Sequence, residues 1–185
     1  MDKIFTAEDY NSGDGMLTSI WGPSMWHFLH TISFNYPVNP TKQDKQSYCD
    51  YLMSLQKVLP CKYCRDNYTK NLKNARFSKN VFKNRNCFSR FIYRLHEEVN
   101  NMLGKTSNLS YNDVKNRYEH FRSRCLIDKK DKIINGKVIE KGCVDSLYGK
   151  KSKCVIKIVP TNSKIKSFKM SPKCKIERKH FKPFK

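Results

Sequence analysis

Long apolar runs are missing from this sequence of 185 residues. No stretch is apolar for long enough to span a bilayer. The N-terminus also lacks the basic start and apolar centre of a secretory signal peptide. We therefore expect a soluble protein that has no transmembrane segment and does not enter the secretory pathway by this route.

Acidic residues are scarce as well: there are 16, against 37 Lys and Arg, which gives a net charge of +21. The excess is uneven, because residues 126–185 carry 18 basic and 5 acidic side chains. A basic tail of this kind is typical of a contact surface for nucleic acid, an acidic protein or a membrane. A coding bias toward Lys, Asn and Ile explains the same composition equally well.

Cysteine, by contrast, is plentiful, with eight residues. Without a secretory signal, this number favours metal binding or thiol–disulfide chemistry over a passive disulfide scaffold. Cys61 and Cys64 form a CxxC motif directly after Leu59 and Pro60. Pro60 suits the start of a helix, and thiols in a first helical turn have a lowered pKa. Alone, such a motif serves a redox dithiol, half of a zinc site or a structural disulfide.

Helical periodicity dominates residues 21–125, and no strand is expected there. Pro23 is placed as a first helical residue, and a capping box of Thr41 with Asp44 begins a second helix. We predict an all-α domain, a four-helix bundle plus a short fifth helix, over residues 21–125. The expected helices are roughly 23–36, 42–59, 61–72, 87–103 and a short one from 111. The apolar stripes that face the core include Tyr48, Tyr51, Leu52, Leu55, Val58, Leu59, Phe88, Phe91, Ile92, Leu95, Val99, Met102 and Leu103.

The flanking regions have a different character. Residues 1–20 show no periodicity and are expected to be a flexible leader. Residues 126–185 are a basic C-terminal extension with short strands, among them a hairpin at Asn135-Gly136 and a strand from Cys154 to Val159. The last 25 residues are expected to be disordered.

Three groups of polar and aromatic residues occur in the helical domain. Trp26 and His30 lie one turn apart; His96 and Asn100 share a helix face near Lys105; and Arg117 precedes Tyr118. Each group alone has an ordinary structural explanation. Together they offer stacking planes, an amide and cations, which suit a large planar cofactor with phosphates.

The motifs WGPxxWxxLH (21–30), LPCxxC (59–64) and HxxVNxxLGK (96–105), followed by an aromatic after Arg117, resemble those of the Erv/ALR FAD-linked sulfhydryl oxidases. The resemblance covers about residues 20–125 and looks most like the versions encoded by large DNA viruses. It implies a homodimeric helical bundle that binds FAD and no metal. The positions that match cofactor contacts are Gly22, Trp26, His30, His96, Asn100, Lys105, Arg117 and Tyr118.

The resemblance also implies a reaction. A protein dithiol, such as that of a thioredoxin-like relay protein, exchanges with the disulfide at Cys61. Cys64 then passes two electrons to FAD, and O2 takes them to give H2O2. The implied location is host cytoplasm or virion, where the basic tail would contact nucleic acid or an acidic virion protein. Glu97 and Tyr93 depart from the family pattern, which usually has Asn and a structural cysteine at these positions.

Four further cysteines, Cys125, Cys143, Cys154 and Cys174, follow the helical domain. Many members of the family carry a shuttle disulfide on a flexible arm, and Cys143 and Cys154 are the nearest such pair here. A structural disulfide or a small metal site carries equal weight.

The alternative function is a zinc-stabilised basic nucleic-acid-binding module that uses Cys61, Cys64, His120 and Cys125. The sequence has no second CxxC and no HxxxH pair, and its CxxC lies between two long amphipathic helices. These features favour the oxidase. No βαβ pattern surrounds the motif, which disfavours a thioredoxin-type enzyme.

Overall fold

The structure is a computed structural model that describes residues 6–124 and, beyond them, residues 133–134, 137–138, 145–146, 154–156 and 168–170. The chain divides into two compact units. The first comprises residues 1–108 with 158–163, and the second comprises residues 109–157 with 164–185. In the residues that the structure describes, no helix is both long enough and apolar enough to cross a membrane.

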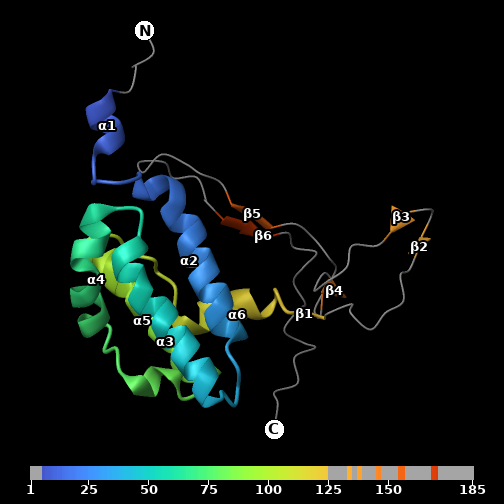
Figure 1. Ribbon diagram of the computed structural model, residues 1–185. Coiled ribbons are helices and arrows are strands. Elements are labelled where there is room, and N and C mark those ends of the chain that lie inside the picture. Colours follow the sequence, from blue (N-terminus) through green and yellow to red (C-terminus); the bar gives the residue numbers. More distant parts are fainter. Residues whose placement is uncertain are drawn as a thin grey trace. The chain divides into compact units, whose positions relative to one another are not determined.

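The first unit is a helical bundle, which confirms the predicted all-α class. In Figure 1, α2, α3, α4 and α5 run alternately up and down. Helix α5 packs against α2 and α4, and α3 packs against α4. The elements are α1 (Ala7–Asn11), α2 (Thr18–Asn35), α3 (Lys42–Val58), α4 (Lys62–Asn74), the 3₁₀ helix η1 (Lys79–Phe82) and α5 (Arg85–Met102).

The predicted apolar stripes of α3 and α5 form a large part of the bundle's core, to which α2, α4 and η1 add residues such as Leu29, Leu72 and Phe82. Leu52 and Leu55 of α3 are buried, as are four residues of α5, namely Phe88, Phe91, Ile92 and Leu95. Val58 and Leu103, also expected to face the core, are 64% and 46% exposed. Val58 is the last residue of α3 and Leu103 is the C-cap of α5, so both lie where the helix leaves the packed face.

The segment before Trp21 differs from the predicted flexible leader. Residues 7–11 form a helix with a capping box at Thr6 and Asp9, and α2 begins at Thr18, so Pro23 lies inside the helix and is not its first residue. The backbone between α1 and α2 hydrogen-bonds to Pro60 and Lys62. A leader without regular structure is therefore the wrong description of residues 6–20.

The second unit contains α6 (Tyr111–Glu119), which begins with the predicted capping box of Ser110 and Asp113. Three antiparallel pairs of strands follow: β1 (Ser123–Arg124) with β4 (Asp145–Ser146), β2 (Ile133–Ile134) with β3 (Lys137–Val138), and β5 (Cys154–Ile156) with β6 (Phe168–Met170). The antiparallel β2–β3 pair flanks the predicted hairpin turn, whose residues Asn135 and Gly136 lie outside the described residues. Strand β1 was not expected, and β6 lies in a stretch that was predicted to be disordered.

Candidate active site

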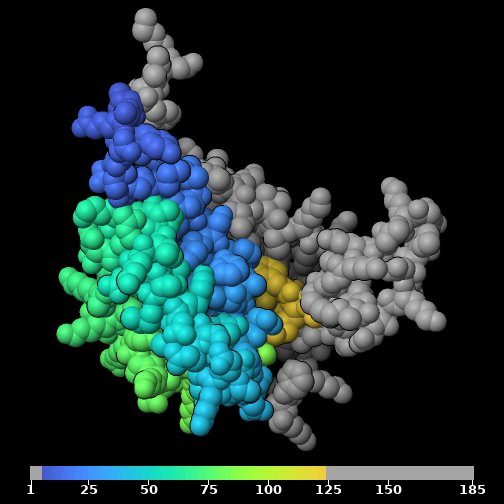
Figure 2. All heavy atoms as spheres, viewed as in Figure 1, coloured from blue at the N-terminus to red at the C-terminus, as the bar shows by residue number. Residues whose placement is uncertain are grey.

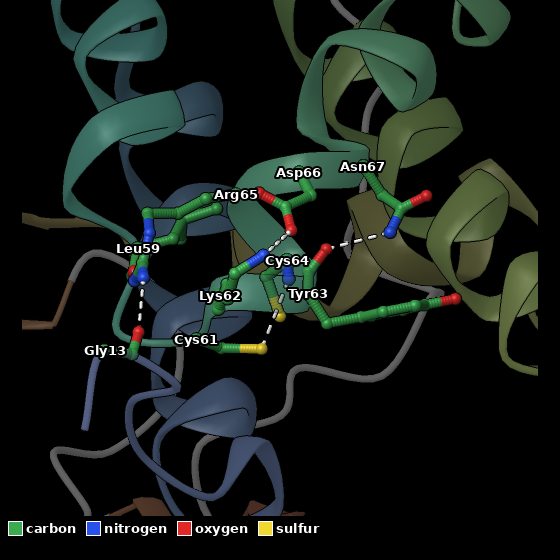
Figure 3. Close-up of polar contacts among 9 residues, drawn as sticks. All are labelled: Gly13, Leu59, Cys61, Lys62, Tyr63, Cys64, Arg65, Asp66 and Asn67. Carbon is green, nitrogen blue, oxygen red and sulfur yellow. Dashed lines mark hydrogen bonds and ion pairs between the residues drawn. The ribbon is translucent and has the colours of Figure 1, made fainter.

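The CxxC motif lies at the start of α4. Cys61 is the N-cap residue, with extended φ and ψ of −155° and 121°, and its Sγ accepts a hydrogen bond from the backbone N–H of Cys64 at 3.2 Å (Figure 3). Pro60 therefore precedes the helix, whereas the sequence predicted that it would be the first helical residue. Both cysteines are half-buried free thiols. In Figure 3 the ring of Tyr63, which stands between them in sequence, extends away from the two sulfurs.

The pKa of the Cys64 thiol differs from the prediction. Burial, then the hydrogen bond with Cys61 and the charge of a Cys61 thiolate, raise the pKa of Cys64 to about 12. Its backbone hydrogen bond and the nearby Arg65 act in the opposite direction. The expected lowering at a helix N-terminus is outweighed, because two adjacent thiols cannot both ionise easily in a half-buried site.

Three predicted cofactor contacts form a ring cluster between α2 and α5. The rings of Trp26 and His96 stack with centroids 4.0 Å apart and an interplanar angle of 8°. His30 Nε2 lies 3.0 Å from His96 Nδ1. Burial lowers the pKa of His96 to about 4, so this imidazole is neutral at physiological pH. The cluster therefore offers stacking surfaces and a hydrogen-bonded pair of imidazoles.

The end of α5 holds the second predicted group. Asn100 Nδ2 donates a hydrogen bond to Glu97 Oε1 at 3.0 Å, so the carboxylate at the unusual position 97 is bonded to a predicted contact residue. Lys105 is exposed, and its backbone N–H donates to the carbonyl of Asn100 at 2.8 Å. On α2, a Cβ added at Gly22 would meet nothing within 4 Å, so this position faces open space.

The remaining predicted residues belong to the second unit. Arg117 and Tyr118 lie on α6, in the second unit, where the Tyr118 ring packs edge-on against Phe121. Cys143 lies outside the described residues, and of Cys154 only the backbone, at the start of β5, is described.

The zinc alternative gains no support from this part of the chain. Cys125, one of its ligands, lies outside the described residues, and His120 Nδ1 lies 2.5 Å from the carbonyl oxygen of Asn116. No group of three His, Cys, Asp or Glu side chains that could hold a metal occurs within the described residues.

Two features beside the dithiol were not predicted. Arg65 donates hydrogen bonds to the carbonyls of Leu59 and Gly13, and Gly15 lies opposite Cys61 in a β-bridge. The one sequence signal was the presence of Gly13 and Gly15 within three residues, since glycine often marks a close approach of two backbones.

Comparison with known proteins places this geometry in a family. The Erv1/Alr family model matches residues 23–119. A probable FAD-linked sulfhydryl oxidase of Acanthamoeba polyphaga mimivirus is 35% identical over 85 residues, which are 46% of this chain and 59% of the relative. The FAD-linked sulfhydryl oxidase ERV1 of Arabidopsis thaliana is 32% identical over 84 residues, 45% of this chain and 42% of that protein. The chain thus spans about half the length of these two curated relatives.

Solved structures agree. The core of yeast Erv1 has a TM-score of 0.50 at 24% identity, covering 60% of this chain and 92% of that one. The FAD binding domain of Erv1 from Saccharomyces cerevisiae also has a TM-score of 0.50, at 25% identity, covering 56% and 94%. Because the helical fold is shared and the family model spans more than half of the sequence, the chain belongs to the Erv1/Alr family.

Proposed function

We propose that this chain is an FAD-dependent sulfhydryl oxidase that forms disulfides in protein substrates. The observation that carries the proposal is the half-buried Cys61–Cys64 dithiol at a helix start, in the same bundle as the Trp26–His96 stack, in a member of the Erv1/Alr family. FAD, when bound, would accept two electrons from the dithiol and pass them to O2 to give H2O2.

The residues of the first unit fit this cofactor chemically. Trp26 and His96 provide flat, partly accessible faces for stacking, and Asn100 and Lys105 provide an amide and a cation at the end of the same helix. Gly22 leaves space on α2. We infer that these residues and His30 hold FAD; Arg117 and Tyr118, on α6 of the second unit, remain predicted contacts.

Substrate exchange is assigned to Cys61. A substrate thiolate attacks Sγ of Cys61 in the Cys61–Cys64 disulfide; a bond forms between substrate and Cys61, and Cys64 leaves as a thiolate. The second substrate thiol then displaces Cys61, which releases the oxidised substrate and the reduced pair. Burial is the largest cause of the raised pKa of Cys64, which supports its assignment as the inner cysteine that delivers electrons.

The raised pKa of Cys64 has a mechanistic consequence. Two of its causes, the hydrogen bond with Cys61 and the charge of the Cys61 thiolate, disappear when Cys61 is joined to substrate. Cys64 is therefore a better thiolate, and a better leaving group, in the mixed disulfide than in the free dithiol. Arg65 continues to favour its charged form.

Serine variants test the assignment. We expect Cys61→Ser and Cys64→Ser each to abolish oxygen consumption with dithiothreitol, because either change removes the disulfide. Cys64→Ser, mixed with the disulfide form of a protein substrate, should hold a mixed disulfide at Cys61, detected by mass spectrometry: the Cys61 thiolate attacks the substrate disulfide, one substrate thiolate leaves, and no Cys64 remains to displace the substrate. Cys61→Ser should not form this bond. Cys49→Ser and Cys87→Ser serve as controls that keep turnover. Normal turnover in Cys61→Ser or Cys64→Ser would refute the proposal.

We also infer that the enzyme acts as a homodimer through α2 and α3. The Phe28 ring on α2 is 49% exposed and packs edge-on against Tyr51 of α3, and Met53 on α3 is 43% exposed. Apolar side chains on two adjacent helices suit a contact between copies. Sedimentation equilibrium tests this, and a monomer at micromolar concentration would contradict it. A thioredoxin-like relay substrate and a role of the basic tail in binding nucleic acid remain predictions.

A further inference from the structure

The short segment between α1 and α2, residues 13–16, pairs with the backbone around Cys61; we refer to it as the strap. The Met16 N–H donates to the Pro60 carbonyl at 2.6 Å, and the Lys62 N–H donates to the Asp14 carbonyl at 2.7 Å. Gly15 and Cys61 face each other in the resulting antiparallel bridge. The residues on both sides of Cys61, Pro60 and Lys62, are thus hydrogen-bonded to the strap. Figure 2 shows the blue N-terminal atoms against the green atoms at the start of α4.

Arg65 fastens the strap from the other side. Its Nη1 donates to the carbonyl of Leu59 at 2.6 Å and its Nη2 to the carbonyl of Gly13 at 2.9 Å (Figure 3). The planar guanidinium suits this double contact, because its donors have a fixed geometry. One side chain therefore links the strap to the end of α3, and it projects from the residue that follows Cys64.

Gly15 is the point of closest approach. Its φ is +95°, and a Cβ there would lie 2.6 Å from the Pro60 carbonyl oxygen and 3.1 Å from Cys61 Cα. Both are backbone atoms, so no side-chain movement could relieve the contact. Gly13, two residues earlier, would tolerate a Cβ, which would meet nothing within 4 Å. The strap thus contains one glycine that the geometry requires and one that it does not.

We propose that the strap is a positioning element of the redox site, in which Gly15 and Arg65 hold Cys61 in the extended N-cap conformation that presents its sulfur to incoming thiols. This inference rests on the proposed function and assigns positioning roles within the same site. The Asp14 carbonyl accepts the first free N–H of α4, and the Trp21 indole N–H donates to the Met16 carbonyl at 3.1 Å. The strap consequently joins the redox pair to α2, the helix that carries Trp26 and His30.

The test compares alanine at the two glycines of the full chain. The measured quantity is the rate at which dithiothreitol reduces the Cys61–Cys64 disulfide under nitrogen, followed by mass-tagging of free thiols. We expect Gly15→Ala to slow this exchange about tenfold, since small misplacements of a reacting group cost large factors in rate. Gly13→Ala, which keeps its carbonyl, should exchange within about twofold of the unchanged protein.

Two further readouts separate positioning from folding. The pH profile of exchange in Gly15→Ala should keep its shape, because the charge of Arg65 remains, and circular dichroism should show the same helix content. If Gly15→Ala does not fold, Arg65→Lys replaces it: the cation remains but the double contact is lost, and a comparable slowing is expected. Exchange at the unchanged rate in Gly15→Ala, or in Arg65→Lys, would overturn the proposal.

The outcome is independent of the cofactor. Disulfide reduction by dithiothreitol needs neither FAD nor O2, so failure of the strap appears as unchanged exchange rates. If the proposed function is wrong, the protein without substitutions will contain no flavin.

Discussion

His96 shows how the bundle controls the charge of a single side chain. Its ring is stacked on Trp26 and lies against His30, and burial lowers its pKa to about 4 from an ordinary value of 6.5. Between these two values the unfolded chain takes up a proton that the folded chain does not. The folded state is therefore less favoured as pH falls through this window, by at most roughly 3 kcal/mol at its lower end.

Denaturant unfolding at pH 7 and at about pH 4.5 measures this effect. We expect the free energy of unfolding to fall by roughly 2 kcal/mol more in the unchanged protein than in His96→Gln, which cannot titrate. His27, whose pKa is also lowered by burial, contributes equally to both proteins. An equal loss in the two proteins would contradict the assignment of this pH dependence to His96.

At this scale the sequence predicted where the dithiol lies in the fold better than it predicted the pKa of its thiols. The positions of Cys61 and Cys64 followed from the motif, but the raised pKa of Cys64 did not. That pKa depends on burial and on the distance between two sulfurs, which are properties of the packed bundle. Arg65 was missed because its two carbonyl partners come from Leu59 and from Gly13, 52 positions away in sequence.

Helix caps are the local signals that place the elements of the site. Asn84 is the N-cap of α5, and its side-chain oxygen accepts from the N–H of Cys87 at 2.9 Å. We predict that Asn84→Ala lowers the free energy of unfolding by about 1 kcal/mol, because one N–H of the first turn loses its partner. Urea denaturation measures this change.

The matched control is Asn101→Ala in the last turn of the same helix, at an exposed position. Alanine is the better helix former there, so stability should be unchanged or slightly raised. A loss at Asn101→Ala as large as that at Asn84→Ala would mean that the cap of α5 contributes nothing specific.

Two of the helices that begin with a capping box, α3 and α6, were predicted to start at the right residue. Thr41 with Asp44 and Ser110 with Asp113 form capping boxes in the structure and mark the starts of α3 and α6. The start of α2 was misplaced because Pro23, a residue typical of a first turn, here lies further inside the helix. The strap has no periodicity of its own, since its conformation is set by the residues around Cys61.

At the scale of the whole molecule, the chain divides into two compact units, and the basic C-terminal extension lies mostly in the second. The all-α class of the first unit followed from periodicity and capping alone, and the family comparison agrees with it. The pairing of β5 with β6 does not follow from the sequence, because it joins residues more than ten positions apart in a Lys-rich tail.

The cysteines of the C-terminal extension bear on whether the enzyme oxidises protein substrates as well as small thiols. If Cys143 and Cys154 relay electrons, the double variant Cys143→Ser/Cys154→Ser should oxidise dithiothreitol at the normal rate but a reduced protein substrate several-fold more slowly. Oxygen-electrode assays with both substrates measure this, with Cys125→Ser/Cys174→Ser as the matched control. Unchanged turnover of the protein substrate in the first variant would rule out a relay by this pair.

The visible spectrum of the purified protein shows whether the chain carries a flavin that its dithiol reduces. The oxidase assignment predicts flavin absorption bands that are bleached by dithiothreitol under nitrogen and return on exposure to air, with the bleaching lost in Cys64→Ser. A colourless protein that contains stoichiometric zinc would refute the oxidase assignment and favour the zinc-stabilised binding module instead.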